Sequence, residues 1–78
     1  MDTIFTFSDE LETTVNLEDI TYFQKVSEAG FPCIKIVFDE DFFLDILYDD
    51  GEHALDTRDE DFNYLTSDYK KCHPVDNS

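Results

Sequence analysis

The chain has 78 residues, and its 20 Asp or Glu against 5 Lys or Arg give a formal net charge of -15. Direct binding to a nucleic-acid backbone or an anionic membrane would bring like charges together, so both are poor partners. The length allows one domain, and 41% hydrophobic residues, with 8 Phe and 4 Tyr, argue against a disordered acidic tail. We therefore expect a single compact acidic domain over residues 1–78.

The first third of the chain predicts a hairpin followed by a helix. Residues 3–7 (TIFTF) are aromatic and β-branched, which predicts a strand, and 12–15 is its candidate partner. Asn16 is a good N-cap, and hydrophobic residues recur at roughly helical spacing until Gly30, which predicts a helix over 17–29. A strand over 20–26 is the alternative, because that segment is rich in β-forming residues.

Residues 33–48 change to a period of two, which predicts a β-hairpin with its turn at 39–41. The first strand places Ile34, Ile36 and Phe38 on one face and Cys33, Lys35 and Val37 on the other. The second places Phe42, Leu44, Ile46 and Tyr48 on one face and Phe43, Asp45 and Leu47 on the other. After an Asp-Gly turn signal at 50–51, residues 53–56 are a candidate third strand.

The C-terminal segment predicts a helix over about 58–71. Thr57 and Glu60 fit a capping box, and Phe62, Leu65 and Tyr69 share one helical face. His73 and Pro74 end the helix, and 73–78 is expected to be a frayed tail. The fold class we expect is α+β: a small three- to four-stranded antiparallel sheet packed against one or two helices.

The sequence predicts neither a membrane anchor nor an exported protein. No apolar run reaches the 18 residues that a membrane-spanning helix needs, and the start lacks the basic and apolar regions of a secretory signal. We expect a cytoplasmic protein, in which Cys33 and Cys72 are free thiols.

Metal-binding and catalytic motifs are weak in this chain. An EF-hand centred on Gly51 would need carboxylates where Ile46, Tyr48 and Thr57 stand. Two Cys and two His lack the spacing of a zinc site, and no phosphate loop or nucleophile motif occurs. We expect no cofactor and no enzyme activity.

The distribution of charge is the most informative feature. Between residues 39 and 61 there are 11 acids against one base, Arg58. We expect these acids to form a partner-binding surface, together with two apolar residues on the outer face of the second strand. The candidate residues are Asp39, Glu40, Asp41, Asp45, Asp49, Asp50, Glu52, Asp56, Asp59, Glu60, Asp61, Phe43 and Leu47.

A concentrated array of carboxylates favours a strongly basic partner. The grooves in which proteins bind nucleic acids are the commonest rigid basic surfaces in cells. The first hypothesis is therefore an inhibitor that mimics DNA or RNA and binds a nuclease or a nucleic-acid-guided defence complex. Some phage anti-CRISPR and anti-restriction proteins act in this manner. Two alternatives remain open: an immunity protein or antitoxin that neutralises a cationic toxin, and a generic acidic domain from a high-salt organism. Neither its target nor its oligomeric state follows from the sequence.

Overall fold

The computed structural model describes residues 3–49 and 51–73, and its α+β architecture agrees with the expected class. A two-stranded sheet, β1 (Ile4–Thr6) and β2 (Thr14–Asn16), leads through a 3-10 turn, η1 (Leu17–Asp19), into a three-stranded sheet. That sheet contains β3 (Tyr22–Glu28), β4 (Phe31–Asp39) and β5 (Phe42–Leu47), is antiparallel and has β4 in the middle. A second 3-10 turn, η2 (Gly51–His53), precedes the helix α1 (Ala54–Cys72).

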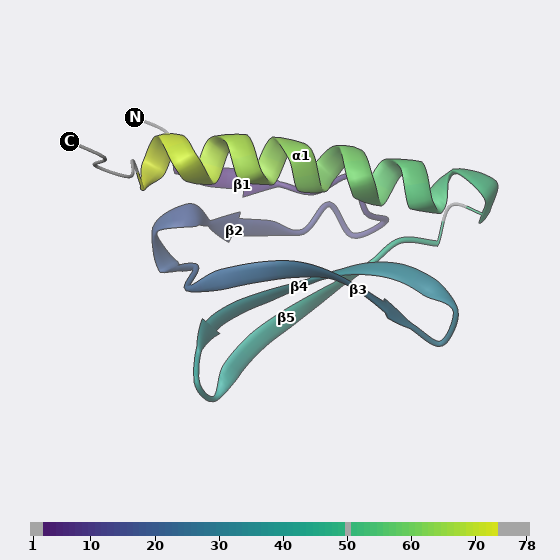
Figure 1. Ribbon diagram of the computed structural model, residues 1–78, viewed down its shortest axis with the longest axis horizontal. Coiled ribbons are helices and arrows are strands. Elements are labelled where there is room, and N and C mark those ends of the chain that lie inside the picture. The colour runs from purple at the N-terminus through teal and green to yellow at the C-terminus, as the bar shows by residue number, and fades with distance from the viewer. Residues whose placement is uncertain (1–2, 50, 74–78) are drawn as a thin grey trace.

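The hydrophobic core lies between α1, the β1–β2 pair and one face of the three-stranded sheet. In Figure 1, α1 and the β1–β2 pair lie on one side of the molecule and the three-stranded sheet on the other. The core cluster joins Phe7 and Val15 from the first pair, Ile34 and Ile46 from the sheet, and Leu65 from the helix. Every layer contributes one apolar face, which is how small α+β domains bury enough surface to be stable.

The N-terminal hairpin matches the predicted strand, with a shifted partner. β1 and β2 pair antiparallel with Phe5 opposite Val15, and both side chains are buried. The connecting loop is held by Asp9, whose carboxylate accepts hydrogen bonds from the Thr13 amide at 2.9 Å and the Thr13 hydroxyl at 2.7 Å.

The predicted helix over 17–29 is wrong, and the alternative of a strand in this region is right. Asn16 does act as a cap, because its side chain accepts a hydrogen bond from the Glu18 amide at 3.1 Å. The helical segment nevertheless ends at Asp19, and β3 begins at Tyr22. β3 pairs with β4 along its whole length, from Tyr22 opposite Val37 to Glu28 opposite Phe31. These cross-strand contacts decide between two patterns that the local sequence supports almost equally.

Gly30 therefore belongs to a hairpin turn rather than to a helix end. Ala29 and Gly30 connect β3 to β4 with φ angles of 52° and 83°. Two consecutive left-handed residues are typical of the type I′ turn, whose twist matches that of the flanking strands.

The β4–β5 hairpin confirms the period-two pattern, with two differences at its ends. Ile34, Ile36 and Ile46 are fully buried against the core, as expected. The alternation predicts Phe42 on the same face, but Phe42 is exposed, because the register shifts between Val37 and Asp39 and the strand starts directly after the turn. The alternation also predicts Cys33 on the outer face, yet its side chain is fully buried.

The helix begins earlier than the sequence predicts, and residues 53–56 are not a strand. α1 starts at Ala54, so Thr57 lies within the helix and does not form a capping box. His53 occupies the cap position and makes no side-chain cap hydrogen bond. The early start follows from a buried stripe at Ala54, Arg58, Asp61 and Leu65, whose spacing of four, three and four residues is helical.

The C-terminal end of α1 is fastened to η1 and to Ile20, which follows it and precedes β3. The Tyr69 hydroxyl donates a hydrogen bond to the Ile20 carbonyl at 3.2 Å, and the His73 ring lies 2.9 Å from the Leu17 carbonyl. The rest of the expected frayed tail, residues 74–78, lies outside the described residues. Across the described part of the chain, α1 included, we find no helix with the length and apolar character needed to cross a membrane.

Candidate interaction surface

The candidate acids divide into a surface group and an inward-facing group. The surface group, here called the acidic edge, begins at the β4–β5 turn, follows β5 and continues through η2 to the first turn of α1: Asp39, Glu40, Asp41, Asp45, Asp49, Glu52 and Asp56. Within it only Asp45 is half-buried, and the others are exposed. Asp50 lies outside the described residues.

The acidic edge is extended rather than gathered in one patch. β5 is an outer strand of its sheet, and its six residues span roughly 20 Å at about 3.3 Å per residue. The β4–β5 turn places Asp39, Glu40 and Asp41 at one end, and Asp49 follows the other end. Glu40 donates its amide to the Asp39 carboxylate at 2.6 Å, which holds that side chain in the turn.

Two acids that the sequence did not single out join this surface. Asp9 and Glu10, from the β1–β2 loop, line a hollow of about 200 Å³ together with Asp45, Leu47 and Asp49. They are more than 30 residues from Asp45 and Asp49 in the chain, so only the tertiary fold brings them together. No local pattern in the sequence signals this proximity.

Asp59 and Glu60 lie on α1, apart from the acidic edge. Asp59 accepts a hydrogen bond from the Arg58 Nε at 2.7 Å and lies 3.6 Å from the Lys25 ammonium. The hydrogen bond from Arg58, helped by the nearby Lys25, lowers the pKa of Asp59 below its usual value. Glu60 is exposed beside the hollow between α1 and β1.

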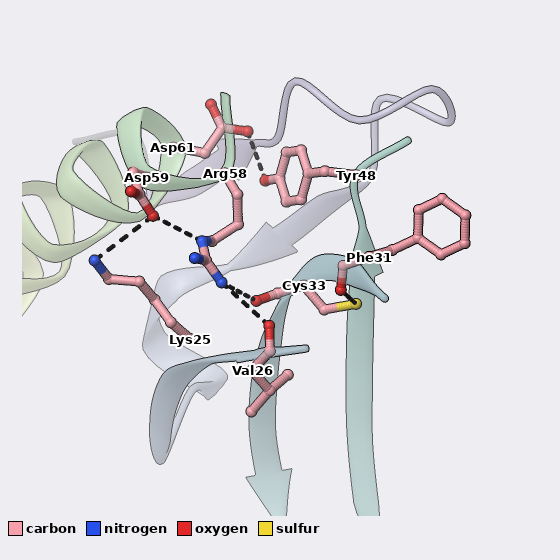
Figure 2. Close-up of polar contacts among 8 residues, drawn as sticks. All are labelled: Lys25, Val26, Phe31, Cys33, Tyr48, Arg58, Asp59 and Asp61. Carbon is pink, nitrogen blue, oxygen red and sulfur yellow. Dashed lines mark hydrogen bonds and ion pairs between the residues drawn. The ribbon is translucent and has the colours of Figure 1, made fainter. Parts of the chain in front are cut away.

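Asp61 faces the interior and has a structural role. It is only 5% exposed, and its Oδ2 accepts hydrogen bonds from the Tyr48 hydroxyl at 2.7 Å and the Ser8 amide at 2.6 Å. Figure 2 shows the Tyr48 hydroxyl directed at this carboxylate. Burial, reinforced by this bond, raises the pKa of Tyr48 far above its usual value. We therefore leave Asp61 out of the acidic edge.

Arg58, the single base among residues 39–61, is also directed inward. It is 8% exposed, and its Nη1 donates to the Val26 carbonyl at 3.1 Å and the Cys33 carbonyl at 3.3 Å (Figure 2). The guanidinium fastens α1 to the β3–β4 hairpin, and its Nε is held by Asp59. Its charge is therefore engaged within the fold and does not neutralise the acidic edge.

The two apolar candidates, Phe43 and Leu47, lie on the outer face of the sheet, and both side chains are exposed. Phe43 is 56% and Leu47 45% exposed, so neither is covered as a core residue would be. The Lys35 ammonium lies 4.8 Å from the centre of the Phe43 ring. Asp45 lies between them, opposite Lys35 in the register, and its Oδ1 is buried without a hydrogen-bond partner in the described structure.

A second hollow continues this surface toward the β4–β5 turn. It has a volume of about 700 Å³ and lies between β2 and the β4–β5 hairpin. Its lining includes Phe38, Phe42 and Phe43 together with Asp19 and Asp39. Apolar side chains beside carboxylates suit a partner that presents both apolar and basic groups.

Among residues 3–49 and 51–73, no three Asp, Glu, His or Cys side chains are grouped closely enough to hold a metal ion. Both cysteines are free thiols. Burial raises the pKa of the Cys33 thiol, which disfavours the reactive thiolate.

The fold and surface together define a small α+β domain with an extended acidic edge beside an open strand. A scan against protein-family models gave no match, and searches of curated proteins and of solved structures gave none either.

Proposed function

We propose that this chain is a small acidic inhibitor that binds the basic, nucleic-acid-binding surface of a bacterial nuclease or defence complex. It occupies the Lys and Arg side chains that would otherwise hold DNA or RNA, as nucleic-acid mimics of the phage anti-CRISPR and anti-restriction type do. The inhibitor acts in the cytoplasm of the host cell, without a cofactor or catalysis of its own.

The density of uncompensated charge is the observation that carries this proposal. Asp2, Asp50 and Asp76 lie outside the described residues, which leaves 17 of the 20 acids against 5 bases and a net charge of -12. The structure is 42 Å long, so it averages about one net charge per 3.5 Å, close to the spacing of about 3.4 Å along one DNA strand.

The placement of the bases supports the same interpretation. Arg58 is directed into the fold, Lys25 lies beside Asp59, and Lys35 covers the Phe43 ring. Lys70 and Lys71 belong to the last turn of α1, where the helix dipole stabilises positive charge. The ion pairs found among the described residues involve only Asp59, so the acidic edge is available to an external cationic surface.

This kind of association has a recognisable dependence on salt. Attraction between a negative edge and a positive groove accelerates the encounter and weakens as salt screens the charges. The apolar groups at Phe43 and Leu47 add contacts that salt does not screen. We therefore expect binding that high salt weakens strongly without abolishing it.

Affinity capture with nucleic-acid competition tests the proposal. The immobilised chain is incubated with bacterial lysate in dilute buffer, with and without excess duplex DNA, and retained proteins are identified by mass spectrometry. A retained nuclease is then purified and its cleavage of DNA or RNA is measured with and without the chain. We expect DNA to displace the nuclease and the chain to inhibit cleavage. Retention that DNA leaves unchanged, or cleavage that continues at full rate, would contradict mimicry.

A further inference from the structure

The outer edge of β5 presents peptide groups that no described residue satisfies. In an antiparallel pair, opposed residues alternate between those that exchange hydrogen bonds and those whose peptide groups point away from the partner strand. The Tyr48 amide donates to the Pro32 carbonyl at 3.0 Å, which makes this pair hydrogen-bonded. Counting back along β5, the peptide groups of Leu47, Asp45 and Phe43 then point away from β4.

An independent contact on β4 gives the same alternation. The Val37 carbonyl accepts a hydrogen bond from the Thr21 amide at 2.8 Å, so it points toward β3 and away from β5. Val37 is the register partner of Phe43, so the Phe43 peptide groups also point outward. Within the described chain, the backbones of Phe43, Asp45 and Leu47 make no hydrogen bond on this outer side.

The β1–β2 pair does not fill this edge. β1 and β2 form a separate sheet, and β5 is the terminal strand in the order β3-β4-β5. The hollows of about 700 Å³ and 200 Å³ lie between this pair and β5, one toward each end of the strand. Both hollows are lined by residues of β5.

The charges beside the edge select the chemistry of what binds there. Asp41 directly precedes β5, Asp45 lies within it and Asp49 lies two residues after it. Asp9 and Glu10 line the adjoining hollow. A second copy of this chain, paired through β5 about a two-fold axis, would bring these carboxylates against one another, and like charges directly opposed destabilise a sheet. A strand with Lys or Arg side chains meets opposite charge instead.

We infer that an extended segment of the target, with alternating basic and apolar side chains, adds to β5 as a fourth strand. Its backbone pairs with the peptide groups of Phe43, Asp45 and Leu47, and its side chains meet the acidic edge and the apolar residues between the acids. This mode of recognition combines main-chain hydrogen bonds for affinity with side-chain contacts for specificity. The inference rests on the proposed function for the identity of the target, and the binding mode itself is measurable without that target.

The other edge of the sheet provides an internal comparison. By the same alternation, Phe23, Lys25 and Ser27 point their peptide groups outward from β3. Lys25 places a cation beside that edge, 5.2 Å from the Phe62 ring. Lysine on an edge strand is a common guard against strand addition. We therefore expect β5, and not β3, to accept the added strand.

Amide hydrogen exchange with a model peptide tests this binding mode on the full chain. The probe is an eight-residue peptide that alternates Lys and Val, and the control alternates Lys and Pro. The control has the same charge, but its prolines lack amide donors and disfavour sheet pairing. In the free protein, the amides of Phe43, Asp45 and Leu47 should exchange rapidly, and the Lys-Val peptide should slow them by about tenfold or more.

A pair of variants separates backbone pairing from charge attraction. Leu47→Pro removes the outward amide and the side chain, whereas Leu47→Ala removes most of the side chain only. We expect Leu47→Pro to bind the Lys-Val peptide about tenfold more weakly than Leu47→Ala, as the loss of one hydrogen bond implies. Circular dichroism of both variants reports whether the fold is retained.

The outcomes separate this inference from the proposed function. Equal binding of the Lys-Val and Lys-Pro peptides, or slowed exchange at Phe23, Lys25 and Ser27 instead, would overturn strand addition. The nuclease assay is independent of that result, because an inhibitor can cover a basic groove without pairing its backbone. Conversely, peptide pairing at β5 with no nuclease inhibited would retain the binding mode and reject the proposed target.

Discussion

Two polar residues of α1, Arg58 and Asp61, occupy positions on its buried face that apolar side chains usually fill. Each is acceptable there because its hydrogen-bonding groups are satisfied: Arg58 by two carbonyls and Asp59, and Asp61 by Tyr48 and Ser8. A buried polar group without partners would destabilise the fold by several times the net value of a hydrogen bond. These contacts join the helix to β3, to β4, to the residue that follows β5 and to the β1–β2 loop.

The same two residues show where sequence patterns fail. Phe62, Leu65 and Tyr69 are apolar and recur at helical spacing. This pattern correctly predicts the packed face of a helix. Arg58 and Asp61 continue that face toward the N-terminus, but a charged residue taken alone indicates a surface position. The predicted helix start and the predicted exposure of Asp61 are therefore wrong for one physical reason.

Replacing Tyr48 by Phe tests the buried hydrogen bond. Tyr48→Phe removes the hydroxyl that donates to Asp61 at 2.7 Å, which should lower the free energy of unfolding at pH 7 by about 1–2 kcal/mol. The measurement is urea unfolding followed by circular dichroism. Tyr64→Phe, at a 61% exposed position on α1, is the control and should change little.

The pH dependence of this variant gives a sharper test. Since the pKa of Tyr48 is raised in the folded state from its usual 10.0, only the unfolded chain releases this proton as the pH rises through about 10. The contribution of Tyr48 is therefore complete below pH 10 and declines above it, whereas Tyr48→Phe lacks this decline. The stability difference should shrink between pH 9 and 11, at about 1.4 kcal/mol per pH unit once above the unfolded pKa. A constant difference would contradict burial of the hydroxyl.

At the scale of elements, pairing with a neighbouring strand decides between helix and strand where the local sequence fits both. The period-two pattern of residues 33–48 is strong enough to predict β4 and β5, because alternation sustained over two adjacent segments is not compatible with a helix. Residues 17–28 contain both a real N-cap and a run of β-formers, and the outcome depends on β4, which lies later in the chain. A single segment does not contain that information.

The β3–β4 turn contains a residue that is not well suited to the backbone conformation it adopts. Ala29 has a φ angle of 52°, a conformation that costs an L-residue with a Cβ roughly 1 kcal/mol. Ala29→Asn should raise the free energy of unfolding by about 0.5–1 kcal/mol, since Asn is favoured in type I′ turns. Urea unfolding measures the change.

Gly30→Ala is the matched opposite of this substitution. Gly30 has a φ angle of 83°, and no atom lies within 4 Å of an added Cβ, so the effect is conformational rather than steric. We expect Gly30→Ala to lower the free energy of unfolding by about 1 kcal/mol. Equal effects of the two substitutions, or a destabilised Ala29→Asn, would contradict the assigned turn.

For the whole molecule, the fold converts a sequence cluster of acids into an extended line. The α+β class, the β4–β5 hairpin and the concentration of acids between residues 39 and 61 all follow from composition and periodicity. Their final arrangement does not, because it depends on which side chains turn inward and on the approach of the β1–β2 loop. That loop adds Asp9 and Glu10 to the surface, while Arg58 and Asp61 are directed into the interior.

This arrangement also favours a specific role over a general effect of charge. Self-repulsion among unneutralised carboxylates lowers stability, and apart from Lys35, which lies over the Phe43 ring, the bases lie elsewhere in the fold. A domain that needs acids only for hydration would gain nothing from aligning them beside an open strand with exposed Phe43 and Leu47. Their alignment beside apolar residues supports the proposed binding to a basic protein surface.

The most direct test of this account compares two charge reversals by their affinity for the nuclease recovered in the capture experiment. Asp41→Lys with Asp49→Lys changes the acidic edge beyond each end of β5, and Glu18→Lys with Glu28→Lys makes the same change in net charge at exposed positions elsewhere. Isothermal titration calorimetry should show at least about tenfold weaker binding for the first pair and nearly unchanged binding for the second. Equal losses for both pairs, or none for the first, would show that the acidic edge is not the contact surface.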